Sequence, residues 1–423
     1  MLKTSSVEKS RIIKVRNVIS SLFACHLEPF DKCSRQAPSR DKRITIKKQG
    51  INSKMNIQQL KSYAAATWVN RKGKSVADKY VIIESDDWGA IRTPSIEALN
   101  AFKEKGVDLS KSVYKVDALA SKDDLEQLFN VLKKYKGNNG KPAKITANAI
   151  MANPDFQKIK ESNFKEFHYE KFTETFKKYP AHQNNIAIWK QGIQENVFKP
   201  QFHGREHLNY KRWLQVLQSN NEAAHFCFNL NATYSGEADY SFMEAYDWDT
   251  PDDILEQKKV IEDGISIFKE TFGEVSNSFI APCYNWDSLL EETLKDNGVQ
   301  WLQGIRSQYK PTGKFDEYEP IKHSFGEKNK LGQQYNIRNC FFEPSMNPNK
   351  DWVQSCLAQI TSAFHWSKPA VICSHRINYV GFIDKKNSDR GLKDLDELLT
   401  AIVKKWPDVN FISTDELTEV MNA

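Results

Sequence analysis

The sequence predicts an α/β protein built on one parallel sheet that closes into a (β/α) barrel. Short apolar runs alternate with longer amphipathic segments from about residue 79 onward, which is typical of a parallel sheet covered by helices. About seven or eight strand–helix units fit one barrel better than two doubly wound domains. The length of 423 residues permits this, and 40% hydrophobic and 27% charged residues exclude a disordered or collagen-like chain.

Strands are expected where a short run rich in β-branched residues is followed by polar residues. In chain order they cover 80–85, 143–149, 198–202, 278–281, 300–305, 335–342, 370–373 and 409–412. Helical apolar spacing predicts helices at 94–105, 123–134, 209–218, 254–272, 287–297, 352–364 and 392–404. Ser121 with Asp124, and Thr250 before Pro251, are typical helix starts.

The positive charge is concentrated at the amino end. Residues 1–54 contain 13 Lys and Arg against four Asp and Glu, a net +9, so the other residues sum to −3 and the chain to +6. Because this segment has little hydrophobic periodicity, we expect a basic, disordered extension, and a nucleic-acid or membrane-surface tail is the alternative. Met55 is a candidate native start. Residues 55–78 are then a helical lead-in, and 79–423 form the barrel with insertions near 152–195 and 219–248.

Cysteines and apolar runs bear on the cellular compartment. Seven cysteines without a C-x-x-C pair argue against a disulfide framework or thiolate zinc site and favour a reducing compartment. The sequence has no apolar run of about eighteen residues, so no transmembrane segment is expected. The apolar stretch 18–25 is short and contains two serines, unlike an ordinary signal peptide. We expect a cytoplasmic protein, with export through a weak leader as the alternative.

Two adjacent aspartates end the first strand. Active sites of barrels lie at the carboxyl ends of the strands, so Asp86 and Asp87 are candidate functional residues. Neighbouring side chains diverge at a strand end, and we expect one to bind a metal while the other takes a proton from water. The simpler interpretation is a pair of solvated or helix-capping aspartates.

Two histidines follow the third strand. His203 and His207 are four residues apart, so we expect them on one face of a helical turn, where both rings reach one cation. Two neutral imidazoles and a carboxylate suit zinc and leave a coordination position for water. Such a pair is often incidental by itself, but its place at a strand end favours a divalent metal site here.

Further candidates follow the later strands. His375 could protonate a leaving group, act as a third metal ligand, or be a buried, hydrogen-bonded histidine, and the local sequence leaves these open. Arg92 and Arg376 could bind substrate or only make structural hydrogen bonds. Aromatic rings commonly stack on sugars, although most are simply packed in the core, and the rings expected beside the site are Trp88, Tyr284, Trp286 and Tyr379.

Taken together, these motifs resemble those of the polysaccharide deacetylase family, the NodB-homology group of carbohydrate esterases (carbohydrate esterase 4, CE4). The resemblance covers roughly residues 79–420, and its first two motifs are fairly specific in combination. The matching residues are Asp86 and Asp87 for the first motif, His203 and His207 for the second, Pro282 and Tyr284 for the third, and His375 for the last.

The resemblance implies a distorted (β/α)7 barrel of the glycoside hydrolase/deacetylase type and a divalent metal, usually zinc. It implies Asp86 as general base, His375 as general acid, and a metal held by Asp87, His203 and His207. The backbone N–H near Tyr284 would stabilise the oxyanion, and Trp88, Arg92 and Arg376 are substrate-side candidates. The implied reaction is hydrolysis of an N- or O-acetyl group on a sugar, so the expected partner is a carbohydrate and not nucleic acid.

The sequence departs from the family pattern in its third motif. The arginine that usually opens this motif and holds the base is absent, and Ala281 stands near its place. Candidates to replace it from other strands are Arg92, Arg205, Arg338 and Arg376, and the carboxylate that tunes the acid histidine is unassigned. Two alternatives therefore stay open: a glycoside hydrolase on a related barrel, and a carbohydrate-binding protein with a degenerate site.

Overall fold

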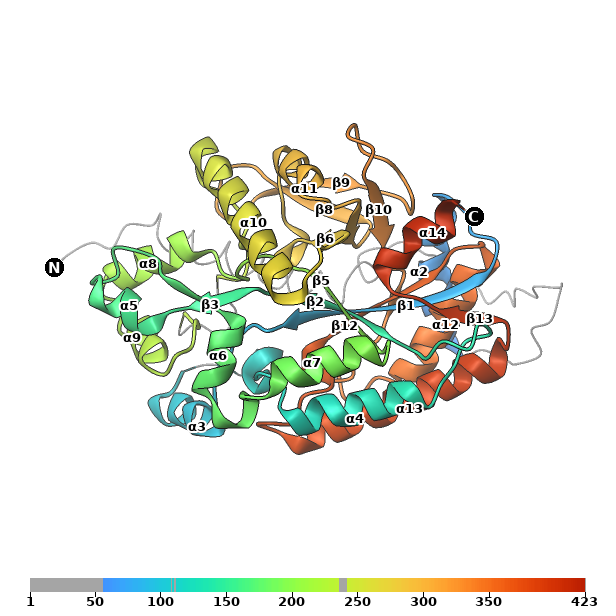
Figure 1. Ribbon diagram of the computed structural model, residues 1–423, viewed down its shortest axis with the longest axis horizontal. Coiled ribbons are helices and arrows are strands. Elements are labelled where there is room, and N and C mark those ends of the chain that lie inside the picture. The colour runs from blue at the N-terminus through green and yellow to red at the C-terminus, as the bar shows by residue number, and fades with distance from the viewer. Residues whose placement is uncertain (1–55, 108, 110–111, 236–241, 423) are drawn as a thin grey trace, which may run out of the picture.

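The computed structural model describes residues 56–107, 109, 112–235 and 242–422. Its main sheet is parallel, with strands in the order β10-β7-β6-β5-β2-β1-β12-β11 and with β13 paired to the beginning of β1 (Figure 1). Helices cover the sheet, so the predicted α/β class with a parallel sheet is confirmed. The predicted basic extension over 1–54 and the candidate start at Met55 lie outside the described residues.

Every expected strand has a counterpart in the main sheet. Its strands are β1 (Lys79–Trp88), β2 (Ile145–Ala149), β5 (Phe198–Phe202), β6 (Ser278–Ile280), β7 (Trp301–Gly304), β10 (Gln334–Ile337), β11 (Cys340–Phe341), β12 (Ala370–His375) and β13 (Val409–Phe411). Two antiparallel pairs were not predicted, namely β3 (Ala152–Pro154) with β4 (Tyr169–Lys171), and β8 (Ser307–Pro311) with β9 (Tyr318–Lys322). These four strands are only three to five residues long, and β9 is largely exposed. Neither antiparallel pair therefore shows the buried apolar run that predicts a strand.

One stretch of chain forms both edges of the main sheet. β10 pairs with β7, and after only Arg338 and Asn339 the chain continues as β11, which pairs with β12. The Arg338 N–H donates to the Gly304 carbonyl at 2.8 Å, and the Asn339 N–H donates to the Val371 carbonyl at 3.1 Å. Hydrogen bonding therefore passes from one neighbour to the other within two residues. The sheet must curl until its two edges meet at this stretch.

All seven helices predicted with bounds are present, although the helix expected at 287–297 begins four residues later, and the one expected at 392–404 seven residues earlier, than predicted. The helices are α2 (Ile57–Asn70), α3 (Ile96–Lys105), α4 (Lys122–Lys133), α5 (Phe156–Glu161), α6 (Phe172–Lys178), α7 (Asn185–Gln194), α8 (Tyr210–Gln218), α9 (Glu222–Asn229), α10 (Pro251–Phe272), α11 (Glu291–Asp296), α12 (Trp352–His365), α13 (Lys385–Lys405) and α14 (Leu417–Asn422). Ser121 and Asp124 form a reciprocal capping box at α4, and at α10 the Asp253 carboxylate accepts from the Thr250 N–H at 2.9 Å. None of the described helices is long and apolar enough to cross a membrane.

The segments expected to be insertions contribute small elements near one end of the sheet. Residues 152–195 contain β3, α5, β4, α6 and α7, and α9 lies within 219–248. In Figure 1, helices α5, α8 and α9 lie together at the left, beyond the carboxyl end of β1. Helices α4, α7 and α13 lie below the sheet, and α10 and α11 lie above it. Helices α5 and α9 thus lie on the side where the strand ends place the candidate site, whereas α7 lies along the sheet.

Helix α13 packs very tightly against the turn that follows β12. A Cβ atom added at Gly391 would lie 1.7 Å from the carbonyl oxygen of Asn378. The Asn378 amide in turn donates to a carboxylate oxygen of Glu343 at 2.7 Å and to the His375 carbonyl at 3.1 Å. The glycine therefore permits a backbone approach that positions groups around His375.

Gly391→Ala is expected to lower the free energy of unfolding by about 1–3 kcal/mol because the added methyl group overpacks this contact. The better helix propensity of alanine, about 1 kcal/mol, is too small to offset a clash with backbone. Urea unfolding followed by circular dichroism measures the change. Asp389→Ala, at an exposed position of the same helix, should stay within about 0.5 kcal/mol of the wild type. Equal stability of Gly391→Ala and wild type would contradict the close approach.

Candidate active site

A distortion at the end of β1 separates the two aspartates. The pairing register of β1 with β2 shifts between Ser85 and Trp88, and Asp87 has a φ of 74°, in the left-handed region. Irregular strand ends of this kind redirect side chains, and a non-glycine residue in this conformation is uncommon. Asp86 and Asp87 are both buried yet contact different groups. The side chains of the two adjacent aspartates therefore diverge into different surroundings.

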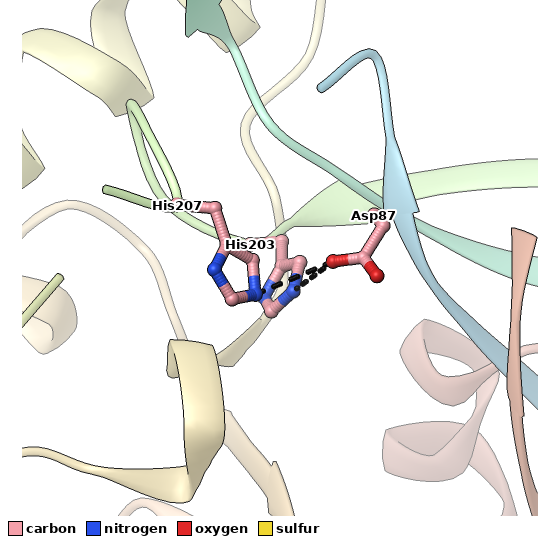
Figure 2. A group of neighbouring side chains, drawn as sticks. All are labelled: Asp87, His203 and His207. Carbon is pink, nitrogen blue, oxygen red and sulfur yellow. Dashed lines mark ion pairs between the residues drawn. The ribbon is translucent and has the colours of Figure 1, made fainter. Parts of the chain in front are cut away.

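Asp87 faces the two histidines that were predicted to join it. Its Oδ1 atom lies 3.6 Å from His203 Nε2 and 3.3 Å from His207 Nε2 (Figure 2). The two imidazole rings are nearly perpendicular, with centroids 5.0 Å apart. One potential ligand atom from each residue lies within 4.8 Å of the others, so the three can contact one ion.

The histidines do not share a helical turn, so that part of the prediction is wrong. His203 directly follows β5, and residues 203–209 form an irregular loop. Gly204 has a φ of 118°, which is incompatible with a helix and is strained for a residue with a side chain. The loop nevertheless brings both rings to Asp87, because the chain turns at Gly204 and so places His203 and His207 on the same side.

The protonation and hydrogen bonding of these groups suit a metal ligand set. The His203 Nδ1 atom lies 2.9 Å from the Ile280 carbonyl, which can only accept, so Nδ1 carries a proton and Nε2 is the ring nitrogen that faces Asp87. That Nε2 atom is buried without a hydrogen-bond partner. Burial lowers the pKa of His207 well below its usual value and keeps it neutral. Neutral imidazoles with a carboxylate are a donor set for zinc and similar divalent cations.

Arg92 supports Asp87, and its position does not match the substrate role expected from sequence. It is buried, with Nη2 3.0 Å from Asp87 Oδ1 and Nε 3.2 Å from Asp117 Oδ2. Burial alone would raise the pKa of Asp87, but the Arg92 guanidinium beside it is the largest opposing influence and this pKa lies well below the usual range. Arg92 therefore keeps the carboxylate ionised and in place.

Arg338 is the arginine that holds Asp86. It donates from Nη1 and Nη2 to the two carboxylate oxygens of Asp86, both at 2.6 Å, and from Nε to Glu84 at 2.7 Å. Asn148 adds a 2.8 Å hydrogen bond to Asp86 Oδ1. Burial favours protonation of Asp86, but the guanidinium outweighs it and holds the pKa of Asp86 below its usual range. Of the four candidate arginines, the structure places this one on the predicted base.

His375 lies between Asp86 and a second carboxylate. Its Nε2 atom is 3.8 Å from Asp86 Oδ2, and its Nδ1 atom donates to Glu343 Oε1 at 2.6 Å. Burial lowers the pKa of His375, but the charge and hydrogen bond of Glu343 outweigh it and raise this pKa to about 9. His375 is therefore protonated at neutral pH, as a general acid requires. Glu343 fills the role that was left unassigned.

Glu343→Gln is expected to move the alkaline limb of the pH profile of kcat/KM lower by about 1–3 pH units, the usual effect of a neighbouring opposite charge. Activity that needs protonated His375 falls as pH rises through its pKa, and the variant removes the charge that raises it. Rates of the expected acetyl hydrolysis, measured between pH 5.5 and 10, give the position of the limb. The exposed Glu319→Gln should leave it unchanged. An unshifted limb in Glu343→Gln would show that another group controls it.

The aromatic residues expected to stack on sugar are in the core. Trp88 is 1% exposed, packs edge-to-face on Phe198 with centroids 4.9 Å apart, and donates from its indole to Ser85. Trp286 and Tyr379 are also buried. The substrate role predicted for Trp88 is wrong, because the register shift after Ser85 and the left-handed Asp87 break the strand alternation and leave Trp88 in the core.

Two further predictions for the substrate side are corrected. Arg376 is fully buried and bound to Asp117 and to the Ala90 carbonyl, so it ties loops together. The N–H of Tyr284 donates to the Ala281 carbonyl at 3.0 Å, so the predicted oxyanion donor is engaged within its own turn. The Tyr284 hydroxyl instead accepts from Arg338 Nη1 at 3.1 Å.

Glu84 and Glu343 are the site residues that the sequence reasoning missed. Glu343 directly follows the expected strand 335–342, so the rule that found Asp86 and His375 would also have found it. Glu84 stands inside the apolar run of β1, two residues before Asp86, and is completely buried. A carboxylate within a buried strand is itself a signal, because it requires a cationic partner.

Neither a protein-family model nor a curated protein matches the sequence. Solved structures that match include a 4-α-glucanotransferase from Thermococcus litoralis, with 9% identity, TM-score 0.41, and coverage of 82% of this chain and 40% of that one. Another is the peptidoglycan deacetylase PdaC from Bacillus subtilis, with 11% identity, TM-score 0.34, and coverage of 82% and 92%. A CE4 family pseudoenzyme from Bacillus anthracis matches at 10% identity, TM-score 0.34, and coverage of 81% and 66%. The chain thus spans less than half of the glucanotransferase, and the matches include CE4 proteins, the family that its motifs resemble.

Proposed function

We propose that this protein is a metal-dependent hydrolase that removes an N- or O-linked acetyl group from a carbohydrate. The observation that carries the proposal is the division of labour between adjacent carboxylates. Asp87 faces His203 and His207, whereas Asp86 is held by Arg338 and lies beside protonated His375. A metal site thereby adjoins a base and an acid, which is the arrangement that hydrolysis of an amide or ester uses.

The reaction divides among the residues as follows. Asp87, His203 and His207 would hold a divalent cation, which would supply a lowered pKa for a water molecule and polarisation of the acetyl carbonyl. Asp86 accepts the proton that the attacking water loses, and Arg338 keeps Asp86 ionised beforehand. His375 donates its Nε2 proton to the amine or alcohol that leaves, and Glu343 stabilises the protonated imidazole until then.

The curling of the sheet supports the (β/α)7 barrel that the resemblance to the deacetylase family implies. If β10 and β11 are counted as one strand, β1, β2, β5, β6, β7, β10–β11 and β12 make a ring of seven. The residues that carry the proposed reaction lie at or just after the carboxyl ends of these strands, where barrel enzymes have their active sites. We therefore interpret the sheet as a distorted (β/α)7 barrel, with β13 added beside β1.

The two alternatives are less well supported by the same contacts. Glycoside hydrolysis uses two carboxyl groups about 5–10 Å apart across the scissile bond. Here Asp86 is committed to Arg338 and Asp87 to the histidines and Arg92, so neither is free for that geometry. The absence of the usual arginine from the third motif favoured a degenerate binding site. Arg338 supplies a guanidinium to Asp86 from elsewhere in the fold, which weakens that alternative.

His203→Ala is expected to abolish both bound metal and turnover, because it removes a ligand whose second ring nitrogen is fixed by the Ile280 carbonyl. Metal analysis of the purified full chain, together with acetate release from a panel of N- and O-acetylated sugars, measures both. His225→Ala is the matched control, since that ring bonds the Leu217 carbonyl outside the site. A wild-type protein that binds no divalent metal would contradict the proposal. Sugar-bond cleavage without acetate release would favour the glycoside hydrolase.

A further inference from the structure

Helix α2 leaves an apolar stripe on its outer face. Its inner face lies on α12, where Ser62 contacts Ser355 and Thr67 contacts Ser362, each through hydroxyls 3.0 Å apart. The exposed fractions of Ile57, Leu60 and Trp68 are 76%, 47% and 55%, and Ala64 between them is also exposed. Positions three or four apart share a helix face, so these four residues form one stripe, which we call the α2 stripe. Clustered exposed apolar side chains on one face indicate an interaction surface.

The α2 stripe lies in a part of the chain that carries only positive charge. From Asn56 to Ala77, the described part of this segment, there are four Lys and Arg and no Asp or Glu. Residues 1–77 carry a net +13, while residues 78–423 sum to −7. Cations also reach the stripe in space, because the guanidinium carbons of Arg71 and Arg306 lie 3.6 and 5.6 Å from the Trp68 ring centroid.

We propose that the α2 stripe, with the exposed cations Lys61, Arg71, Lys72 and Lys74 on α2 or just after it, docks on an anionic lipid surface. Apolar side chains and tryptophan beside Lys and Arg match the boundary between acyl chains and headgroups. Cations near an anionic bilayer add favourable electrostatic energy, and the acidic remainder of the chain is repelled from it, which orients the molecule. A helix that lies on the surface is also consistent with the finding that no described helix could span a membrane.

Other occupants fit this face less well. A second copy of the chain would bring the same cations against one another, and like charges oppose association. Nucleic acid supplies phosphates but no apolar phase that would cover Ile57 and Leu60. The lipid surface is the partner that satisfies both the charge and the apolar stripe. The inference does not depend on the proposed hydrolytic activity.

Co-sedimentation of the full chain with vesicles tests the inference. The wild type should bind vesicles of 70% phosphatidylcholine and 30% phosphatidylglycerol, bind pure phosphatidylcholine at least tenfold more weakly, and lose binding as salt is raised. Leu60→Gln with Trp68→Gln should weaken binding to anionic vesicles at least tenfold. Lys61→Gln and Lys72→Gln should each weaken it about fivefold. Leu289→Gln changes an equally exposed leucine elsewhere, 59% exposed, and should bind like the wild type.

Specific results would overturn the inference. One is no binding to anionic vesicles, and another is equal weakening by Leu289→Gln and by the double α2 variant. Binding to duplex RNA or DNA at the same salt, without vesicle binding, would assign the cations to nucleic acid. Concentration-dependent dimers in sedimentation, lost in the double variant and without vesicle binding, would assign the stripe to a second copy. Thermal unfolding of each variant separates these results from loss of folding.

Discussion

Asp86→Asn is expected to lower the rate of acetate release about 10²–10⁴-fold, the usual contribution of a general base, while the protein keeps its bound metal. The reason is geometric, because Asp86 faces Arg338 and His375, whereas the metal group is built from Asp87 and the two histidines. An asparagine retains the size and one acceptor oxygen but cannot take a proton. Steady-state hydrolysis and metal content of the same preparation measure both quantities.

Asp87→Asn is the matched control because it makes the same chemical change one residue along β1. It should lose metal and activity together, since it removes the anionic member of the metal group. The contrast between the two variants tests the division of labour directly. Full activity in Asp86→Asn would mean that the base is wrongly assigned, and metal loss in both variants would mean that the carboxylates act as one unit.

Arg338→Met is expected to lower the free energy of unfolding by about 3–5 kcal/mol at pH 7.5, the usual cost of leaving buried charges without a partner. Arg338 is completely buried and hydrogen-bonded to both Glu84 and Asp86, so its removal leaves buried Glu84 without its cationic partner and takes the bidentate partner from Asp86. Urea unfolding monitored by circular dichroism gives the change. Activity should fall as well, because Asp86 loses its position and its ionised state.

The pH dependence of stability distinguishes this cause from simple loss of packing. Without Arg338, burial raises the pKa of Asp86 in the folded state above its unfolded value, so the variant should regain stability as pH falls from 7.5 towards 5. In the wild type the pKa of Asp86 is lower in the folded than in the unfolded protein. Asp86 therefore stabilises the fold above its unfolded-state pKa, and this stabilisation disappears only as pH falls through its folded-state pKa. Arg338→Lys keeps a charge but cannot pair bidentately with Asp86, and should lose less stability than methionine. A pH-independent loss in Arg338→Met would indicate packing alone.

Much of the architecture could be predicted because it follows from local patterns. The strand at 198–202 was predicted with its observed ends, and the start of α4 from Ser121 and Asp124. Asp86, Asp87, His203, His207 and His375 were singled out because each follows an apolar run at a strand end. The structure brings these five residues close together, although their positions in the sequence span almost 290 residues.

The parts that could not be predicted depend on tertiary contacts. Four arginines were candidates to hold Asp86. Because the sheet curls, Arg338 is the one that reaches Asp86, whereas Arg205 pairs with Glu206. Trp88 was misplaced because a bulge and a left-handed residue at Asp87 break the strand alternation on which orientation is judged. The His203 loop was misjudged because Gly204 adopts a conformation that spacing alone does not reveal.

The pairing of the first strand of the sheet, β1, with the late strand β12 has a consequence for how the chain is synthesised. Val81 of β1 pairs with Ala370 of β12, about 290 residues later, so a ribosome adding roughly 5–20 residues per second needs about 15–60 s between the two. During that interval the buried run of β1 lacks one neighbour and exposes an aggregation-prone edge. Closing so long a loop is also entropically costly and slow. Nascent chains released before Gln334–Phe341 has emerged should therefore be inactive and depend on chaperones.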